Sequence, residues 1–173
     1  TQHAHFWTLP ELPVALLRYM LFFFFSPLLC FGMIFRYRIG LIVAQGPYEG
    51  AAAACAKIAA GWFGRRVILI IENHGDFEES LFMQRRVILR RFYRAVMTVV
   101  ARFALHYADL LRAVSNTTRQ QLERWRPGCH VFQFVAWTDI DPFFAAGQSR
   151  KKIFSPAILY AGVLIPRKGV IHL

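Results

Sequence analysis

The feature that most constrains the fold is an alternation of short apolar runs with longer helical stretches, which begins after Gly40. The four runs cover residues 41–45, 67–71, 109–114 and 131–135. Short apolar runs of this kind are typical of strands that are buried on both faces, and the stretches between them are long enough for crossover helices. The alternation therefore predicts an α/β fold, with a Rossmann-like parallel sheet that is covered by helices on both faces.

Three helices are expected between these strands, at residues 51–62, 78–107 and 115–125. Ser115 stands at the start of the last of them, where a serine side chain can accept a hydrogen bond from a free backbone N–H. A nucleophilic role for Ser115 is less favoured, because the residues around it lack the GxSxG pattern of a nucleophile elbow. Ser115 is therefore expected to be a helix cap.

The end of the chain indicates a second domain. Residues 138–152 are polar and contain proline, glycine and serine, as linkers do. A further apolar run follows at residues 157–161, with Gly162 at its end and Pro166 suited to the first position of a helix. We therefore expect a domain over residues 1–137, a linker over 138–152, and the first βα unit of a second domain over 153–173.

The most hydrophobic stretch, residues 19–35, precedes the first predicted strand, and a helix is expected over 14–36. Its 17 residues would extend about 25 Å as a helix, slightly less than the hydrocarbon core of a bilayer. Arginines flank it at positions 18, 36 and 38. Three interpretations stay open: a core or interfacial helix, a monotopic membrane anchor, and a transmembrane span, which is least favoured because a strand follows closely.

The net charge of +11 favours an anionic partner, such as a membrane surface, a nucleic acid or a phosphorylated substrate. The helix expected over 78–107 carries a broad arc of arginines, which is consistent with a solvated face or with contact to anionic lipid headgroups. Nucleic acid is not expected as a partner, since no recognition motif accompanies the charge. The arginines of the arc are Arg85, Arg86, Arg90, Arg91 and Arg94.

The three cysteines are widely spaced and form no CxxC pair. This spacing argues against a disulfide framework and against a zinc site, and it favours a reducing compartment. We expect neither a metal nor another cofactor.

Ligands of parallel α/β sheets bind beyond the carboxyl ends of the strands. His74 follows a predicted strand there, where its imidazole can donate to a sugar hydroxyl or act as a base; the alternative is a loop histidine bonded to a neighbouring carbonyl. Arg167 and Lys168 lie in the first turn of the last predicted helix. Cations are unfavourable at that end of the helix dipole, so they indicate either a bound anion such as phosphate or a solvated basic turn.

Five segments together resemble a known family. They read VAQGPYEG, ENHGDFEES, ADLLRAVSNTTRQQLER, FVAWTDIDPF and ILYAGVLIPRKGV. In this order and spacing they are similar to the family 4 (GT4-type) glycosyltransferases of the GT-B fold, and the resemblance runs from residue 41 to residue 173. The hydrophobic segment before residue 41 also resembles the membrane-associated helices of some members.

The resemblance implies two Rossmann-like domains that face each other across a cleft. The N-terminal domain would bind the acceptor and the C-terminal domain a nucleotide-sugar, and the sugar would be transferred with retention of configuration and without a metal. On that pattern the chain holds the later part of the acceptor domain and the start of the donor domain, and the first strand with its glycine-rich loop lies upstream of Thr1. We expect such a fragment alone to be inactive.

The resemblance also implies roles for particular residues. Lys168 matches the lysine of a KG pair that neutralises the donor diphosphate, with Gly162 and Arg167 beside it. Val163 departs from the family, many of whose members have an arginine there, so Arg167 would supply that contact. His74 matches a strand-end histidine near the transferred sugar and is the expected catalytic residue. The acceptor-side loops would contribute Gly46, Tyr48, Glu49, Asn73 and Ser115.

The function expected from the resemblance is a hexosyltransferase-type enzyme that acts on a glycan, a lipid-linked acceptor or a small acceptor. We expect it in the cytoplasm, peripherally associated with an anionic membrane surface. The alternative is a non-enzymatic membrane-surface module that uses the Phe-rich helix and the arginine face. An epimerase of related fold is disfavoured by the first and third of the segments quoted above.

Overall fold

The computed structural model describes residues 15–78, 90–134, 141 and 144–145. The chain divides into two units, and the fold given below is that of the first, Thr1–Ala136. The predicted linker at 138–152 lies outside the described residues apart from 141 and 144–145, and the predicted βα unit at 153–173 lies wholly outside them.

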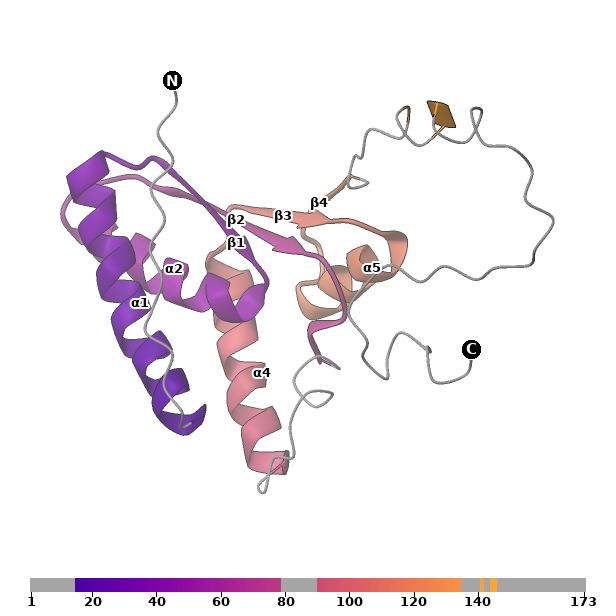
Figure 1. The fold of residues 1–173 in the computed structure, drawn as a ribbon, viewed down its shortest axis with the longest axis horizontal. Coiled ribbons are helices and arrows are strands. Elements are labelled where there is room, and N and C mark those ends of the chain that lie inside the picture. The colour runs from indigo at the N-terminus through magenta and orange to yellow at the C-terminus, as the bar shows by residue number, and fades with distance from the viewer. Residues whose placement is uncertain (1–14, 79–89, 135–140, 142–143, 146–173) are drawn as a thin grey trace. The chain divides into compact units, whose positions relative to one another are not determined.

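A four-stranded parallel sheet forms the centre of this unit (Figure 1). Its order is β1-β2-β3-β4, so every strand pairs with the strands that precede and follow it along the chain. The strands are β1 (Leu41–Gln45), β2 (Ile68–Asn73), β3 (Leu110–Ala113) and β4 (Val131–Gln133). The prediction of an α/β fold with a parallel sheet and flanking helices is confirmed, and the arrangement is compatible with a Rossmann-like fold.

The helices of the described residues are α1 (Ala15–Tyr37), α2 (Pro47–Trp62), α4 (Arg90–Tyr107) and α5 (Asn116–Trp125). Helix α2 begins four residues before its predicted start, because Pro47 supplies a preset φ at the first helical position and Gly46 precedes it at φ 120°. Helix α4 covers the end of the helix predicted over 78–107, and residues 79–89 lie outside the described residues.

Helices α2, α4 and α5 all lie on one face of the sheet, below it in Figure 1. The expectation that helices cover both faces is therefore wrong for the described residues. Along the chain, each new strand is added at the same edge of the sheet. Right-handed crossovers between such strands place every connecting helix on the same face. The opposite face, which we call the open face, carries exposed apolar side chains: Leu41, Val43, Ile68, Leu110 and Phe132.

Small residues bring α2 close to the sheet. A methyl group at Gly50 would lie 2.6 Å from Cδ1 of Ile71 in β2, so the helix backbone sits directly on that strand. Ala53 and Ala54 are buried in the same cluster, where they pack with Ala104 of α4. The alanine-rich sequence of α2 is thus explained by the short distance between the layers.

Helix α1 packs on α2 through one side only. Ile34 is fully buried against Ala56 and Ala60 of α2. The prediction of a helix over residues 14–36 is confirmed to within one residue at each end, and the helix continues through Pro27. No helix among the described residues has the length and hydropathy needed to cross a membrane.

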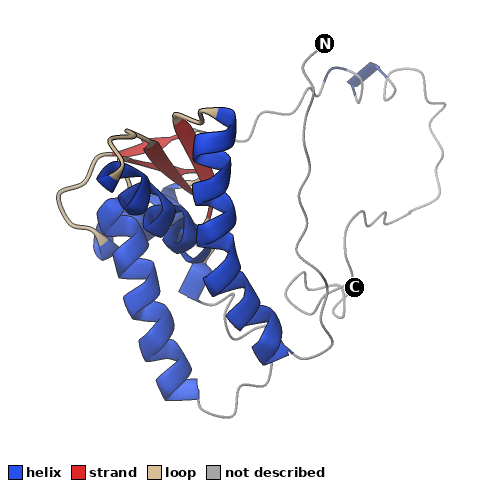
Figure 2. Ribbon diagram, turned by 90° about the vertical axis from the view of Figure 1, so that its left-hand side faces the viewer, coloured by secondary structure: helices blue, strands red, loops and turns tan. Residues whose placement is uncertain are grey.

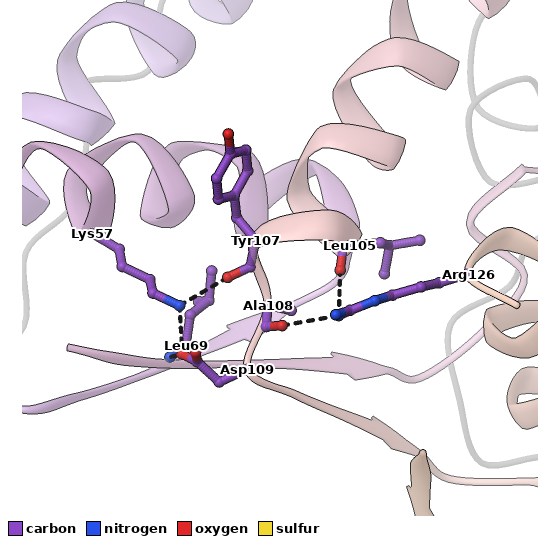
Figure 3. Close-up of polar contacts among 7 residues, drawn as sticks. All are labelled: Lys57, Leu69, Leu105, Tyr107, Ala108, Asp109 and Arg126. Carbon is purple, nitrogen blue, oxygen red and sulfur yellow. Dashed lines mark hydrogen bonds and ion pairs between the residues drawn. The ribbon is translucent and has the colours of Figure 1, made fainter. Parts of the chain in front are cut away.

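The C-terminal end of α4 is held by a side chain from α2 and by one from the C-cap of α5 (Figure 3). Arg126 donates to the backbone oxygens of Leu105 and Ala108, at 2.7 and 2.9 Å. On the other side, Lys57 donates to the oxygen of Tyr107 at 2.9 Å and pairs with Asp109 at 2.6 Å. Two cations therefore bind carbonyl groups at the negative end of the helix dipole.

Replacing Arg126 by methionine is expected to lower the free energy of unfolding by about 2 kcal/mol, since two partly buried carbonyls lose a charged donor. Urea denaturation followed by circular dichroism would measure the change. The matched control is Arg124→Met, an exposed arginine in the last turn of α5, which should change stability by less than about 0.5 kcal/mol. Equal losses in both variants would contradict the capping role.

Candidate functional site

The carboxyl ends of the strands meet at one edge of the sheet. Strands β1, β2 and β3 end at Gln45, Asn73 and Ala113, and Gly46, His74 and Ser115 lie just beyond them. The register places Gln45 beside Glu72 and Glu72 beside Arg112. Because side chains alternate along a strand, Glu72 and Asn73 point to opposite faces, and two separate polar clusters result.

The first cluster joins three charged or titratable side chains on the open face. Glu72 forms an ion pair with Nη1 of Arg112 through Oε1, and its Oε2 lies 3.0 Å from Nε2 of His74. Glu72 is only 8% exposed, whereas the side chain of His74 is 47% exposed. The guanidinium of Arg112 also lies over the ring of Phe134, 3.8 Å from its centroid. The cluster thus consists of a buried carboxylate that holds an exposed imidazole.

This geometry determines what His74 can do chemically. With a proton on Nε2, the imidazole donates to Glu72, and Nδ1 is left as an acceptor. An imidazole oriented by a carboxylate can bond a sugar hydroxyl or accept its proton. His74 is therefore an exposed imidazole that a buried carboxylate orients.

Glu72 and Arg112 were missed by the sequence reasoning, although a signal was present. Each is the single charged residue of its strand. An isolated charge in a buried strand requires a partner of opposite charge. A residue at the paired position of the neighbouring strand can provide it. The two lone charges therefore indicated that each side chain needs a partner, but the register that pairs them is a tertiary feature.

The second cluster is buried under the helices. Nδ2 of Asn73 donates to Oε1 of Gln121 at 3.0 Å, and Nε2 of Gln121 donates to Oδ1 of Asp76 at 2.8 Å. Asn73 and Gln121 are each 2% exposed. The structure therefore places Asn73 against α5 and away from the open face. Its hydrogen bonds with Gln121, and those of Gln121 with Asp76, connect β2, α5 and the loop after β2.

Tyr48 lies in an aromatic row beneath the same loop. Its ring contacts Phe77 edge-on, and Phe77 contacts Trp125 in the same way. The Tyr48 hydroxyl donates to the backbone oxygen of Phe77 at 3.2 Å, and Nε1 of Trp125 donates to Glu78 at 2.6 Å. Burial is the largest cause of the raised pKa of Tyr48, so this phenol stays protonated.

Tyr48 and Glu49 were predicted in a loop, but both lie in the first turn of α2. The carboxylate of Glu49 reaches back towards Gly46, where a methyl group would lie 2.7 Å from Oε2. Desolvation raises the pKa of the Glu49 carboxyl, and a hydrogen bond to its own backbone opposes that shift. Gly46 is thus needed for its positive φ and for the space that Glu49 occupies.

The cap predicted at Ser115 is confirmed. Its Oγ accepts from the backbone N–H of Thr118 at 3.2 Å, and its own N–H donates to Oγ1 of Thr118 at 3.1 Å. These reciprocal bonds make a capping box at the start of α5. The side chain of Ser115 is engaged in the cap.

Replacing Ser115 by alanine is expected to lower the free energy of unfolding by about 1 kcal/mol, because the N–H of Thr118 loses its acceptor. Thermal unfolding of the purified chain would measure the change. Ser115→Asp, which keeps an acceptor at the cap, should restore most of the loss. An alanine variant as stable as the wild type would show that the cap contributes nothing.

The predicted site residues are therefore divided among different environments. His74 lies beside Glu72 on the open face, and Asn73 is buried against α5. Tyr48 and Glu49 lie in the first turn of α2, and Gly46 and Ser115 are the N-cap residues of α2 and α5. No three His, Cys, Asp or Glu side chains of the part described by the structure are grouped so that they could hold a metal ion. The predicted diphosphate contacts lie outside the described residues; they are Gly162, Arg167 and Lys168.

Comparison with protein-family models, with curated proteins and with solved structures found no match to this chain.

Proposed function

We propose that the protein to which this chain belongs is a glycosyltransferase, and that the sheet described above is part of its acceptor-side domain. The reaction is the transfer of a sugar from a nucleotide-sugar to a glycan, a lipid-linked acceptor or a small acceptor, with retention of configuration. The observation that carries the proposal is the cluster of Glu72, His74 and Arg112, which lies at the carboxyl edge of a parallel sheet. Ligands bind at that edge in α/β folds.

In this proposal His74 contacts the sugar that is transferred. Its exposed imidazole bonds a hydroxyl group of the donor, and Glu72 keeps the ring in one orientation through the 3.0 Å contact to Nε2. Arg112 holds Glu72 in place and neutralises its charge. Glu72 and Arg112 are thus positioning residues, and His74 is the catalytic residue.

The departing nucleoside diphosphate would be stabilised by residues of the second unit. The sequence resemblance assigns this role to Lys168, with Gly162 and Arg167 beside it. A fixed cation stabilises negative charge as it develops on a leaving group, which is the work that a metal ion does in other transferases. The reaction proposed here therefore requires no metal.

The test is a transfer assay on the full-length protein. Uridine, guanosine and thymidine diphosphate sugars would be supplied with membrane extracts and oligosaccharides as acceptors, and release of the nucleoside diphosphate would be measured. Turnover in EDTA and a product with the donor's anomeric configuration, determined by NMR, are expected. The 173-residue chain assayed alone is expected to be inactive. A folded full-length protein that uses none of these donors would refute the proposal.

A further inference from the structure

Two helices carry large apolar side chains that nothing in the described structure covers. We call these side chains the α1–α4 surface: Phe24, Phe25, Leu28 and Leu29 of α1, and Phe92, Val96 and Val99 of α4. They are between 42% and 67% exposed. Between Arg18 and Arg36, helix α1 carries no charged residue on any side, which is typical of helices that are buried or that contact lipid.

Figure 1 shows the N-terminal halves of α1 and α4 projecting from the sheet in the same direction, and Figure 2 shows the two helices side by side after a quarter turn. A groove of about 250 Å³ separates them and has alanines of α2 as its floor. Phe23 and Pro27 line it from α1, and Val99, Val100 and Phe103 line it from α4. The side chains that line the groove are apolar, so it suits an apolar occupant.

The apolar side chains with which α4 lines the groove continue towards the N-terminus of the helix as a single stripe. Phe92, Val96, Val99 and Phe103 recur at spacings of four, three and four residues, so they share one side of the helix. At 1.5 Å per residue the stripe is about 16 Å long. Its outer half is exposed, and therefore the groove opens onto an apolar surface at the projecting end of α4.

Positive charge lies beside this apolar surface, in the first turns of α4. Arg90, Arg91 and Arg94 lie in the first turns of α4 and line a hollow of about 440 Å³. At 100° per residue, Arg90 and Arg94 lie on the side of α4 opposite to the apolar stripe, and Arg91 lies on its flank. Neither α1 nor α4 contains an aspartate or a glutamate. An amphipathic helix with phenylalanine and valine on one side and arginine on the other is typical of helices that lie in a membrane interface.

We propose that the α1–α4 surface inserts into the interface of an anionic lipid bilayer. The apolar stripe of α4 and the outer side of α1 enter the acyl region, and one acyl chain occupies the groove between the helices. The arginines bind lipid phosphates, to which the planar guanidinium is suited. Lipid is favoured over a protein partner, because the surface combines uniform positive charge with exposed apolar side chains and so complements an anionic bilayer.

The 173-residue chain can be tested by flotation with vesicles. Vesicles of phosphatidylcholine alone would be compared with vesicles that also contain phosphatidylglycerol. The chain is expected to float at least tenfold more strongly with the anionic vesicles, and added salt should weaken the binding. Equal partition to both compositions would overturn the proposal.

The apolar contribution is tested by the double variant Phe24→Glu, Phe92→Glu. Both side chains are 67% exposed, so the fold should tolerate the changes, which circular dichroism would verify. Binding to the anionic vesicles is expected to fall at least tenfold, because two phenylalanines no longer enter the acyl region. The matched control is Phe132→Glu on the open face of the sheet, which adds charge elsewhere and should have a much smaller effect.

The electrostatic contribution is tested by the double variant Arg91→Gln, Arg94→Gln. Each arginine near an anionic surface strengthens binding about fivefold, so the pair should account for roughly 30-fold. The control variant Arg66→Gln, Arg124→Gln removes the same charge from other exposed positions. Equal losses in the two variants would show that net charge alone causes the binding, and would overturn the assignment to this surface.

A second copy of the chain is the competing occupant of the surface. The proposal would be overturned in favour of a protein interface by two results together. The chain would sediment as a dimer that the variant Phe24→Glu, Phe92→Glu converts to a monomer, and it would not bind vesicles. Flotation does not depend on any sugar donor or acceptor. The membrane surface and the transferase activity can therefore fail independently.

Discussion

Replacing Arg112 by leucine is expected to lower the free energy of unfolding by about 2–3 kcal/mol at neutral pH. The substitution leaves Glu72, which is 8% exposed, without the guanidinium that pairs with it. Removing one member of a buried ion pair typically costs 3–5 kcal/mol. The side chain of Arg112 is 34% exposed, so solvent screens the pair and the lower value is expected. Urea denaturation at pH 7 would measure the loss.

A double-mutant cycle separates the charge effect from lost packing. The double variant Arg112→Leu, Glu72→Leu removes both charges, and it should recover most of the stability lost in Arg112→Leu alone. The exposed pair of Arg119 and Glu123 on α5 provides the comparison, since Arg119→Leu should cost less than about 1 kcal/mol. If the double variant were as unstable as the single one, the contact of Arg112 with Phe134 would be the cause of the loss.

Replacing His74 by alanine is expected to lower the rate of sugar transfer by the full-length protein by roughly 10²–10⁴-fold. This prediction rests on the proposed function, in which the exposed imidazole contacts the transferred sugar. Because the side chain is 47% exposed, its removal should leave the fold stable. The turnover number at saturating donor is the quantity to measure, with circular dichroism as the check on folding.

Two further variants distinguish a catalytic His74 from a structural one. Glu72→Gln keeps an acceptor for Nε2 but loses the charge, and it should lower turnover less than His74→Ala does. His106→Ala is the matched control, because His106 is an exposed histidine at the end of α4 and should have no effect. Unchanged turnover in His74→Ala would exclude a catalytic role for this residue, even if the protein transfers sugar.

Much of the fold could be predicted from the sequence because the signals are local. The apolar runs identify all four described strands, since short apolar runs bounded by turn residues are typical of buried strands. The parallel arrangement follows from the helical stretches between the runs. Ser115 was identified as a cap because the hydrogen bonds of a cap join residues only three apart. Part of the candidate site was found in the same way, since His74 directly follows a strand.

The rest of the site depends on contacts between residues far apart in the chain. Asn73 was expected on an acceptor-side loop, but its amide is buried against Gln121 of α5, because the alternation of side chains turns it away from Glu72. The pairing of Glu72 with Arg112 depends on the register of β2 against β3, which no local pattern contains.

The sequence by itself determined the strands, the helices and their order, because propensity and hydrophobic pattern act over a few residues. It did not determine which face of the sheet the helices cover, since that depends on the side to which each strand is added and on the right-handed crossovers between them. That arrangement leaves one face open, and the register of β2 against β3 then places Glu72, Arg112 and His74 together on it. The tertiary structure alone also shows that α1 buries one side against α2 and leaves the other exposed.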